Sequence, residues 1–99
     1  VEAMRGRWRL VASPDGADGS TTIGQDARLW ATVLVPGEQI EYRLSAGRLA
    51  YVQVISGQLS VNGQPLAAGD GAKIADETLL EFLAGEEAEI LLFDLPPVA

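Results

Sequence analysis

The chain of 99 residues contains neither cysteine nor histidine. Without cysteine it cannot form a disulfide, a thiolate nucleophile or a Cys-ligated metal site. Without histidine it lacks the most common general base and the most common ligand of transition metals. Any metal ion would have to be bound by oxygen atoms, which suit Mg²⁺, Ca²⁺ or Mn²⁺ better than Zn²⁺ or Fe²⁺. The usual catalytic triads, which depend on histidine, are excluded as well.

Long apolar runs and basic residues are also scarce. No apolar run approaches the ~20 residues that a membrane-spanning helix requires, and the first ten residues lack an apolar segment of the secretory kind. We therefore expect a cytoplasmic protein without membrane contact. Seven basic residues against fourteen acidic ones give a net charge of −7, so nucleic acid is not an expected partner. We interpret the one basic cluster, Arg5, Arg7 and Arg9, as a polar strand edge or linker.

What the chain does contain is the pattern of a small all-β domain. Apolar residues make up 47% of it, and eleven glycines and five prolines at intervals favour short strands and turns. Apolar runs and alternation predict strands at residues 7–12, 21–23, 28–35, 40–44, 49–55, 59–61, 72–74, 79–83 and 88–95. The run 79–83 would also suit a helical turn or two, but its strand-rich context favours a strand. This pattern predicts an all-β sandwich or barrel.

The stretch 47–74 carries most of the turn signals. Gly57 follows a predicted strand, and Asn62-Gly63 ends the next one. The following residues are expected to form a loop that closes on Gly69 and Asp70. We interpret Gly57, Gly63, Gly69 and Asp70 as structural turn residues, with an acid or ligand role for Asp70 as the less favoured alternative.

Several segments, in order, resemble the C-terminal half of pirin-like bicupins, a family that includes the pirin-related quercetin 2,3-dioxygenases. These segments are WRLVASPDGADGS, IGQDARL, VQVISGQLSVNG, LAAGDGA and LLFDLP. The resemblance covers about residues 8–96. It implies a cupin double-stranded β-helix, a jelly-roll-like small barrel, with residues 1–99 as a single domain. It also implies that the family's metal, usually iron held by histidines and a glutamate, belongs to an N-terminal domain outside this chain.

The metal-binding motifs of cupins can be placed on the sequence through their glycines. With the first motif's glycine at Gly57, its glutamate position falls on Ala50, and the second motif, beginning at Gly69, places its histidine on Leu80. The two histidine positions of the first motif fall on residues that are not histidine: Leu44 and Ala46, or Arg43 and Ser45. The resemblance therefore implies vacant ligand positions, and we expect no metal, no cofactor and no catalysis in this chain.

The same resemblance gives each strand an inner and an outer face, because cupin ligands point into the barrel. The side chains expected inside are apolar: Ala50, Val52, Val54, Leu80 and Phe82. The side chains expected outside are Tyr51, Gln53, Ile55, Leu79 and Leu83. A strand that is apolar on both faces normally has both faces covered. We expect this outer surface to contact an N-terminal cupin domain or a second copy of the chain, which would make a homodimer.

The remaining polar candidates are each interpreted as structural. Asp94 lies in an apolar strand and needs a donor, for which three arginines are available: Arg28, Arg43 and Arg48. We favour a structural ion pair over catalysis. Tyr42, Tyr51 and Gln53 could bind a small ligand at a barrel mouth, but rim or interface positions are favoured.

Acidic residues are interpreted in the same way. We interpret the C-terminal acids as a solvated face, with an oxygen-only divalent metal site as the alternative: Glu77, Glu81, Glu86, Glu87 and Glu89. Asp15 and Asp18 are interpreted as turn residues, because a calcium loop needs further acidic positions.

Three functions remain open. The leading hypothesis is a non-catalytic C-terminal cupin domain with a structural or interface role, supporting a metal-dependent quercetinase-type dioxygenase domain. A free-standing module that binds a small ligand in its barrel is the second, and it requires an open polar cavity. The third is a cupin enzyme with an oxygen-only metal site.

Overall fold

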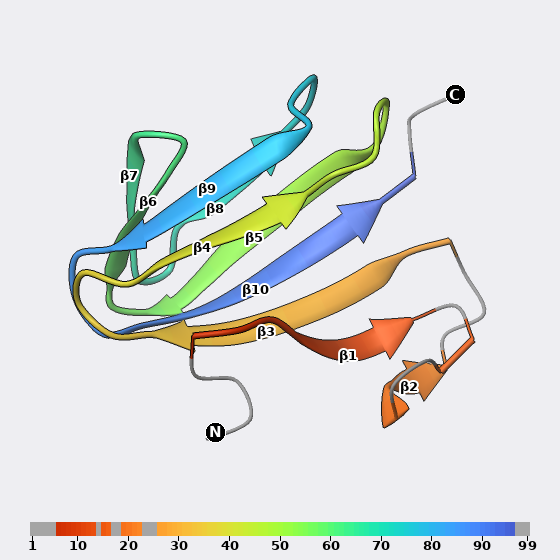
Figure 1. The fold of residues 1–99 in the computed structure, drawn as a ribbon, viewed down its shortest axis with the longest axis horizontal. Coiled ribbons are helices and arrows are strands. Elements are labelled where there is room, and N and C mark those ends of the chain that lie inside the picture. The colour runs from red at the N-terminus through yellow and green to blue at the C-terminus, as the bar shows by residue number, and fades with distance from the viewer. Residues whose placement is uncertain (1–5, 14, 17–18, 23–25, 97–99) are drawn as a thin grey trace.

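Two β-sheets make up the molecule (Figure 1). The computed structural model describes residues 6–13, 15–16, 19–22 and 26–96. Within these ranges the chain forms ten strands: β1 (Arg9–Ser13), β2 (Thr21–Thr22), β3 (Arg28–Leu34), β4 (Gln39–Arg43), β5 (Leu49–Ser56), β6 (Gln58–Val61), β7 (Gln64–Ala67), β8 (Gly71–Ile74), β9 (Leu79–Ala84) and β10 (Ala88–Leu95). One sheet has the order β2-β1-β3-β10-β5-β8 and the other β4-β9-β6-β7. The all-β, single-domain architecture predicted from the sequence is confirmed.

The strands predicted from apolar patterns are all present, with ends that differ by at most two residues. The segment 79–83 is part of strand β9, so its helical alternative is wrong. Its residues alternate between buried and more exposed positions, as a half-buried strand requires. Arg5, Asp18 and Ile23 lie outside the described residues. No described segment is a helix that is long and apolar enough to cross a membrane.

One strand was missed, because the residues after Gly63 were expected to form a loop. They form β7, which pairs antiparallel with β6. Asn62 and Gly63 both have positive φ, 49° and 83°, as a two-residue type I′ hairpin requires. Pro65 obscures this strand because proline cannot donate to a β-ladder. β7 is an edge strand, where proline is tolerated.

Gly57 is the point where the chain passes from one sheet to the other. β5, before it, belongs to the six-stranded sheet, and β6, after it, belongs to the four-stranded sheet. Gly57 has a φ of +81°, and a Cβ atom there would overlap the carbonyl oxygen of Glu87 and lie 2.8 Å from Cα of Ala88. The backbone of this crossing therefore packs directly against the start of β10.

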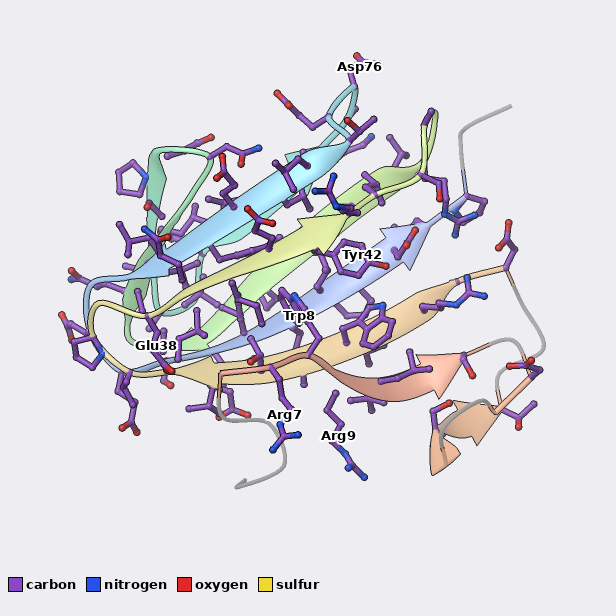
Figure 2. The ribbon with its side chains drawn as sticks, in the orientation of Figure 1. Arg7, Trp8, Arg9, Glu38, Tyr42 and Asp76 are labelled. Atoms are coloured by element: carbon purple, nitrogen blue, oxygen red, sulfur yellow. The ribbon has the colours of Figure 1, made fainter. Side chains whose placement is uncertain are left out.

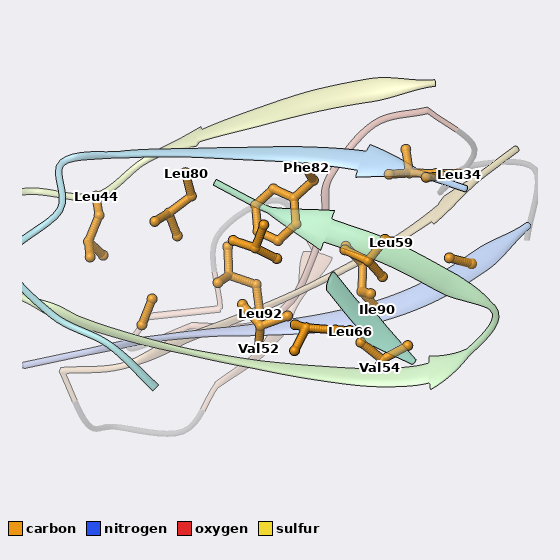
Figure 3. Packing of buried hydrophobic residues seen from close by; sticks show 14 residues of the cluster. Leu34, Leu44, Val52, Val54, Leu59, Leu66, Leu80, Phe82, Ile90 and Leu92 are labelled. Carbon is orange, nitrogen blue, oxygen red and sulfur yellow. The ribbon is translucent and has the colours of Figure 1, made fainter. Parts of the chain in front are cut away.

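The core fills the space between the two sheets (Figure 3). Ala50, Val52 and Val54 of β5 and Leu80 and Phe82 of β9 are at most 1% exposed. The expected inner face is therefore confirmed. Leu34, Ile90 and Leu92 add to the same cluster from β3 and β10. Burial of these side chains is the main term that stabilises the sandwich.

The expected outer surface, in contrast, is divided between two sheets. Tyr51, Gln53 and Ile55 lie on β5 in the six-stranded sheet, whereas Leu79 and Leu83 lie on β9 in the four-stranded sheet. Because the sheets pack with their inner faces together, their outer faces are on opposite sides of the molecule. The expectation that these five residues form one surface is wrong. Strand alternation distinguishes inside from outside, but it does not tell which sheet a strand joins.

Candidate functional site

Three of the positions that would hold a cupin metal lie inside the closed core. Ala50 and Leu80 are 0% exposed, and Leu44 is 2% exposed. Ala50 comes from β5 of one sheet and Leu80 from β9 of the other, so the two positions face the interior from opposite sheets. The other positions considered for histidine, Arg43, Ser45 and Ala46, are exposed.

The side chains at these positions do not fit a metal ion. Alanine and leucine have no lone pair to donate, and most of the side chains packed around them are apolar. The acidic residues do not replace them, because nowhere in the described part of the chain do three or more carboxylates converge as metal ligands. No chemical step through a metal can be derived from this barrel.

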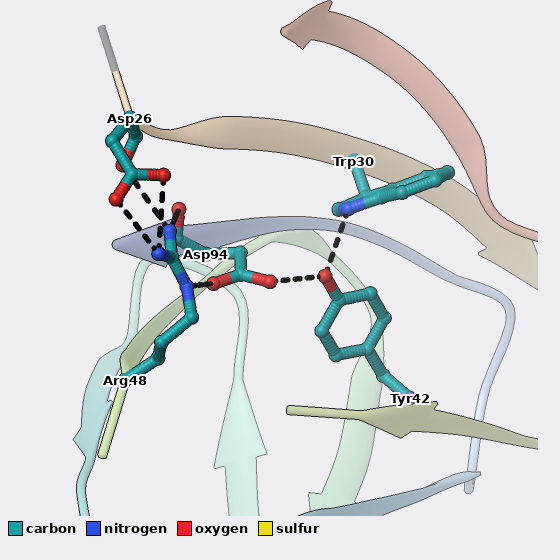
Figure 4. A network of polar contacts seen from close by, with 5 residues as sticks. All are labelled: Asp26, Trp30, Tyr42, Arg48 and Asp94. Atoms are coloured by element: carbon teal, nitrogen blue, oxygen red, sulfur yellow. Dashed lines mark hydrogen bonds and ion pairs between the residues drawn. The ribbon is translucent and has the colours of Figure 1, made fainter. Parts of the chain in front are cut away.

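A polar network stands next to the vacant positions (Figure 4). Asp94 of β10 is the cross-strand partner of Ala50, and Tyr42 of β4 is the partner of Leu80. The Tyr42 hydroxyl donates a hydrogen bond to Oδ2 of Asp94. The Trp30 indole N–H donates to the same hydroxyl at 3.1 Å. The network thus joins β4 in one sheet to β3 and β10 in the other.

Arg48 supplies the cation that the sequence required for Asp94. Its Nε donates to Oδ1 of Asp94 at 2.6 Å, and the Asp94 side chain is only 8% exposed. Its Nη1 also contacts the exposed carboxylate of Asp26, at 3.0 and 3.1 Å. Of the three arginines considered, Arg28, Arg43 and Arg48, it is Arg48 that forms the pair, and Asp26 was not foreseen.

The electrostatics of the network favour a fixed structure over proton transfer. Burial raises the pKa of Tyr42 above its ordinary value, and the hydrogen bond and negative charge of Asp94 raise it further. The hydrogen bond to Asp94 also raises the pKa of Arg48. Tyr42 therefore stays neutral and Arg48 stays charged across the physiological range. Among the described residues, no buried side-chain N or O atom lacks a hydrogen-bond partner.

Trp8 covers the same side of the barrel, a role that its apolar character alone does not predict. Its ring packs edge-on against Tyr42, with 5.9 Å between ring centroids, and against Phe82 at 5.2 Å. Its indole N–H donates to the carbonyl oxygen of Glu41 at 3.0 Å. Trp8 and Tyr42 lie together near the middle of the view in Figure 2. Trp8 thus attaches the segment before β1 to the four-stranded sheet.

The outer face of the six-stranded sheet is the other notable surface. Cross-strand register places apolar side chains of β3, β10 and β5 on this face: Leu29, Ala31, Val33, Leu91, Phe93, Leu95, Leu49, Tyr51 and Ile55. Ala31 and Val33 are already buried within the chain. Tyr51 is 38% and Ile55 47% exposed. The rings of Tyr51 and Phe93 lie 6.2 Å apart. We call this set the six-strand face.

Close contacts hold Tyr51 and Gln53 of β5 in place. A Cβ atom at Gly71 would lie 2.7 Å from Cζ of Tyr51, so the tyrosine ring lies directly over this glycine. The Gln53 amide donates to the carbonyl oxygen of Asp70 at 3.2 Å. Neither side chain lines an opening into the barrel, whose interior is filled.

The turn residues have backbone roles. Gly57, Gly63 and Gly69 all have positive φ. The Asp70 carboxylate accepts a hydrogen bond from the Ala67 N–H at 2.9 Å. That bond occupies an outward-facing donor of the edge strand β7.

Comparison with known proteins identifies the family. The family described as the quercetinase C-terminal cupin domain matches residues 10–95. Quercetin 2,3-dioxygenase of Escherichia coli K12 is 39% identical over 97 residues, which are 98% of this chain and 42% of that protein. A pirin-like protein of Caulobacter vibrioides is 40% identical over 91 residues, 90% of this chain and 39% of that protein.

Solved structures show the same similarity to pirin-like proteins. YhhW from Escherichia coli superposes with a TM-score of 0.90 at 40% identity, covering 92% of this chain and 39% of that one. YhhW has also been solved in complex with nickel(II), with the same TM-score of 0.90. The cupin domain of an XRE-family transcriptional regulator from Enterobacter cloacae shares the fold alone, with a TM-score of 0.62 at 22% identity.

These matches cover nearly the whole chain, and the chain spans only about two fifths of the relatives' length. The resemblance first seen in the sequence motifs is thereby confirmed. The chain belongs to the quercetinase C-terminal cupin domain family.

Proposed function

We propose that this chain is the non-catalytic C-terminal cupin domain of a pirin-like protein and supports a metal-dependent, quercetinase-type dioxygenase domain outside it. The observation that carries the proposal is the sealed apolar interior at the ligand positions. Ala50 and Leu80 are 0% exposed there and cannot bind a metal. The share of each relative that the chain covers supports a role as one domain of a longer protein. The cytoplasmic location stays a prediction.

The six-strand face supports an interface role. The outward positions of its three neighbouring strands are mostly apolar, with Gln53 and Glu89 among them, and an apolar sheet face is normally covered in the assembled protein. The partner in this proposal is the N-terminal cupin domain of the same protein, with a second copy of the chain as the alternative. A paired, preordered aromatic such as Tyr51 is a typical interface anchor.

A small-ligand module is not favoured. It would need an open interior with polar lining, whereas Val52, Val54, Leu80 and Phe82 fill the interior and are at most 1% exposed. An enzyme with an oxygen-only metal site is not favoured either, since carboxylates in the described residues do not converge.

Metal binding and turnover test the non-catalytic part. The purified chain is incubated with iron(II) or, separately, nickel(II), desalted and submitted to elemental analysis. Quercetin absorbance is followed in parallel, with a full-length quercetinase as positive control. We expect far less than one metal per chain and no loss of quercetin. One bound metal per chain, or turnover above the metal-only blank, would overturn the proposal.

Cysteine labelling tests the interface part, because the chain contains no cysteine of its own. Ile55→Cys and Leu83→Cys have similar exposure, 47% and 42%, but lie on opposite outer faces. In the longer protein we expect maleimide to label Leu83→Cys quickly and Ile55→Cys slowly. In the isolated chain both should react, unless a second copy covers Ile55 in a concentration-dependent way. Equal labelling of both variants in the longer protein would refute the assigned face.

A further inference from the structure

A shallow apolar groove lies on the other side of the molecule, over the outer face of the four-stranded sheet. Its volume is about 590 Å³, and its floor includes Leu83 of β9, Ser60 of β6 and Pro65 and Ala67 of β7. These residues are cross-strand neighbours: Leu83 pairs with Ser60, and Ser60 pairs with Pro65. Leu83 is 42% exposed and is one of the few large apolar side chains that the described surface leaves open. We call this hollow the Leu83 groove.

The groove continues past Leu83 into a smaller acidic hollow. This hollow has a volume of about 260 Å³ and shares Leu83 and Ser60 with the groove, while Glu41 and Glu81 line its other side. Glu41 and Glu81 are direct cross-strand partners. Two like charges in that arrangement destabilise a sheet, so the isolated fold gains nothing from this pair.

The one charged residue that lines the Leu83 groove in the described part of the chain, Asp70, is acidic. Glu41 and Glu81 of the acidic hollow carry the same sign. Among the described residues, neither the groove nor the acidic hollow is lined by lysine or arginine. A ligand that complements both hollows therefore has an apolar side chain beside one or more cations.

We propose that the Leu83 groove docks a basic segment of a partner protein, with an apolar side chain of that segment on Leu83 and a neighbouring lysine or arginine between Glu41 and Glu81. This contact lies on the opposite side of the sandwich from the six-strand face. It would leave the proposed domain interface free and does not depend on it.

Two other occupants fit less well. A second copy docked by the same patch would place the acidic rims against each other, because a two-fold contact repeats the same residues on both sides. A strand added to the edge of β7 would find few backbone donors there. Pro65 has no N–H, and the Ala67 N–H already donates to the Asp70 carboxylate. The segment is therefore recognised through its side chains.

Fluorescence anisotropy with the full chain tests the proposal. The probe is a fluorescein-labelled peptide with two central leucines, two lysines on each side and glycine–serine ends. One control peptide replaces the leucines with serine, and another replaces the lysines with glutamate. We expect only the first peptide to bind measurably at protein concentrations up to about 1 mM, and its binding to weaken as salt is raised.

Three variants distinguish binding in the Leu83 groove from nonspecific attraction of the peptide by the protein's surface charge. Leu83→Ser should raise the Kd about tenfold or more, since it removes the apolar anchor. Glu81→Gln should raise the Kd severalfold and reduce its salt dependence. Ile55→Ser, at a position of similar exposure on the six-strand face, should leave the Kd unchanged. Far-ultraviolet circular dichroism and thermal melting confirm that each variant is folded before binding is compared.

Several results would overturn the proposal. These are the absence of binding by the basic peptide, equal binding by the serine control, or an unchanged Kd for Leu83→Ser. If Leu83→Ser instead shifts the sedimentation of the free chain from dimer to monomer, the groove is a contact between copies and the proposal is wrong. None of these outcomes depends on metal binding or on the labelling of Ile55.

Discussion

Gly57 offers the sharpest test of how the two sheets are joined, through the variant Gly57→Ala. Two separate costs are expected. The residue has a φ of +81°, a conformation that costs a non-glycine residue about 1–2 kcal/mol. In addition, the new Cβ would overlap the carbonyl oxygen of Glu87 and lie 2.8 Å from Cα of Ala88. These are backbone atoms at the start of β10, so they cannot rotate away as a side chain would.

Gly63 provides the matched control for the first cost. Its φ is +83°, but a Cβ atom there would have no neighbour within 4 Å. Gly63→Ala should therefore cost only the backbone term of about 1–2 kcal/mol. Gly57→Ala should cost this amount plus about 1–3 kcal/mol for displaced packing, or about 2–5 kcal/mol in total. For a domain with a total stability of about 5–15 kcal/mol, that loss is large.

Urea unfolding, followed by circular dichroism, measures the difference. With an m-value of about 2 kcal/mol/M, the midpoint of Gly57→Ala should lie about 0.5–1.5 M below that of Gly63→Ala. A Gly57→Ala protein that is unfolded without urea, beside a folded Gly63→Ala protein, would agree with the same reasoning. Equal urea midpoints for the two variants would refute this reasoning, because they would show that the backbone at the start of β10 moves aside without loss of stability.

Three further predictions concern the polar network and the six-strand face. Tyr42→Phe should lower stability at neutral pH by about 1–3 kcal/mol, because the buried Asp94 loses a donor and the half-buried Trp30 loses its acceptor. The raised pKa of Tyr42 means that the unfolded chain ionises first as pH rises through about 10, so wild-type stability should fall by about 1.4 kcal/mol in total between pH 9 and 11. That contribution should be missing from Tyr42→Phe when urea midpoints are compared at pH 9–11. Asp94→Asn should cost about 3 kcal/mol, because it removes the buried one of the two carboxylates that pair with the Arg48 guanidinium. Asp26→Asn, at the 64% exposed end of the same network, should cost at most about 1 kcal/mol in the same urea experiment. Gly71→Ala should displace the ring of Tyr51 at a cost of about 1 kcal/mol and change the near-ultraviolet circular dichroism, because a flexible side chain can move aside. An unchanged near-ultraviolet spectrum would contradict the close contact.

Local sequence patterns predicted most of the fold because strand formation here follows apolar alternation and turn chemistry. The failures arose where a residue's meaning depends on its place in the sheet. Pro65 argues against a central strand, yet β7 is an edge strand and tolerates it. Leu79 and Leu83 share outward parity with Tyr51, but they belong to the other sheet. Sheet membership is set by long-range pairing, which alternation does not encode.

The candidate site was predictable only in part for the same reason. The buried position of Asp94 and its need for a cation follow from its place in an apolar strand. The choice of Arg48 depends on a contact between residues 46 positions apart in the chain. Tyr42 was expected at a rim or ligand-binding mouth, but its hydroxyl is used within the protein. The contact of Trp8 with the Glu41 carbonyl spans 33 positions and has no local signal.

The position of the network leads to a last prediction, on metal dependence. A metal bound at the cupin ligand positions would tie the two sheets together, because Ala50 and Leu80 come from opposite sheets. Asp94 is the cross-strand neighbour of Ala50, and Tyr42 is the cross-strand neighbour of Leu80. The hydrogen bond between Asp94 and Tyr42 connects the two sheets at this point. We therefore expect the sheets to keep their separation without a metal. We expect the melting temperature to be unchanged by EDTA or by added iron(II), since only a ligand that binds the folded state can raise it. Tyr42→Phe, which removes the tie, should lower the melting temperature whether or not EDTA is present. A melting temperature that falls in EDTA and recovers with metal would show that the barrel is held by an ion and not by this hydrogen bond.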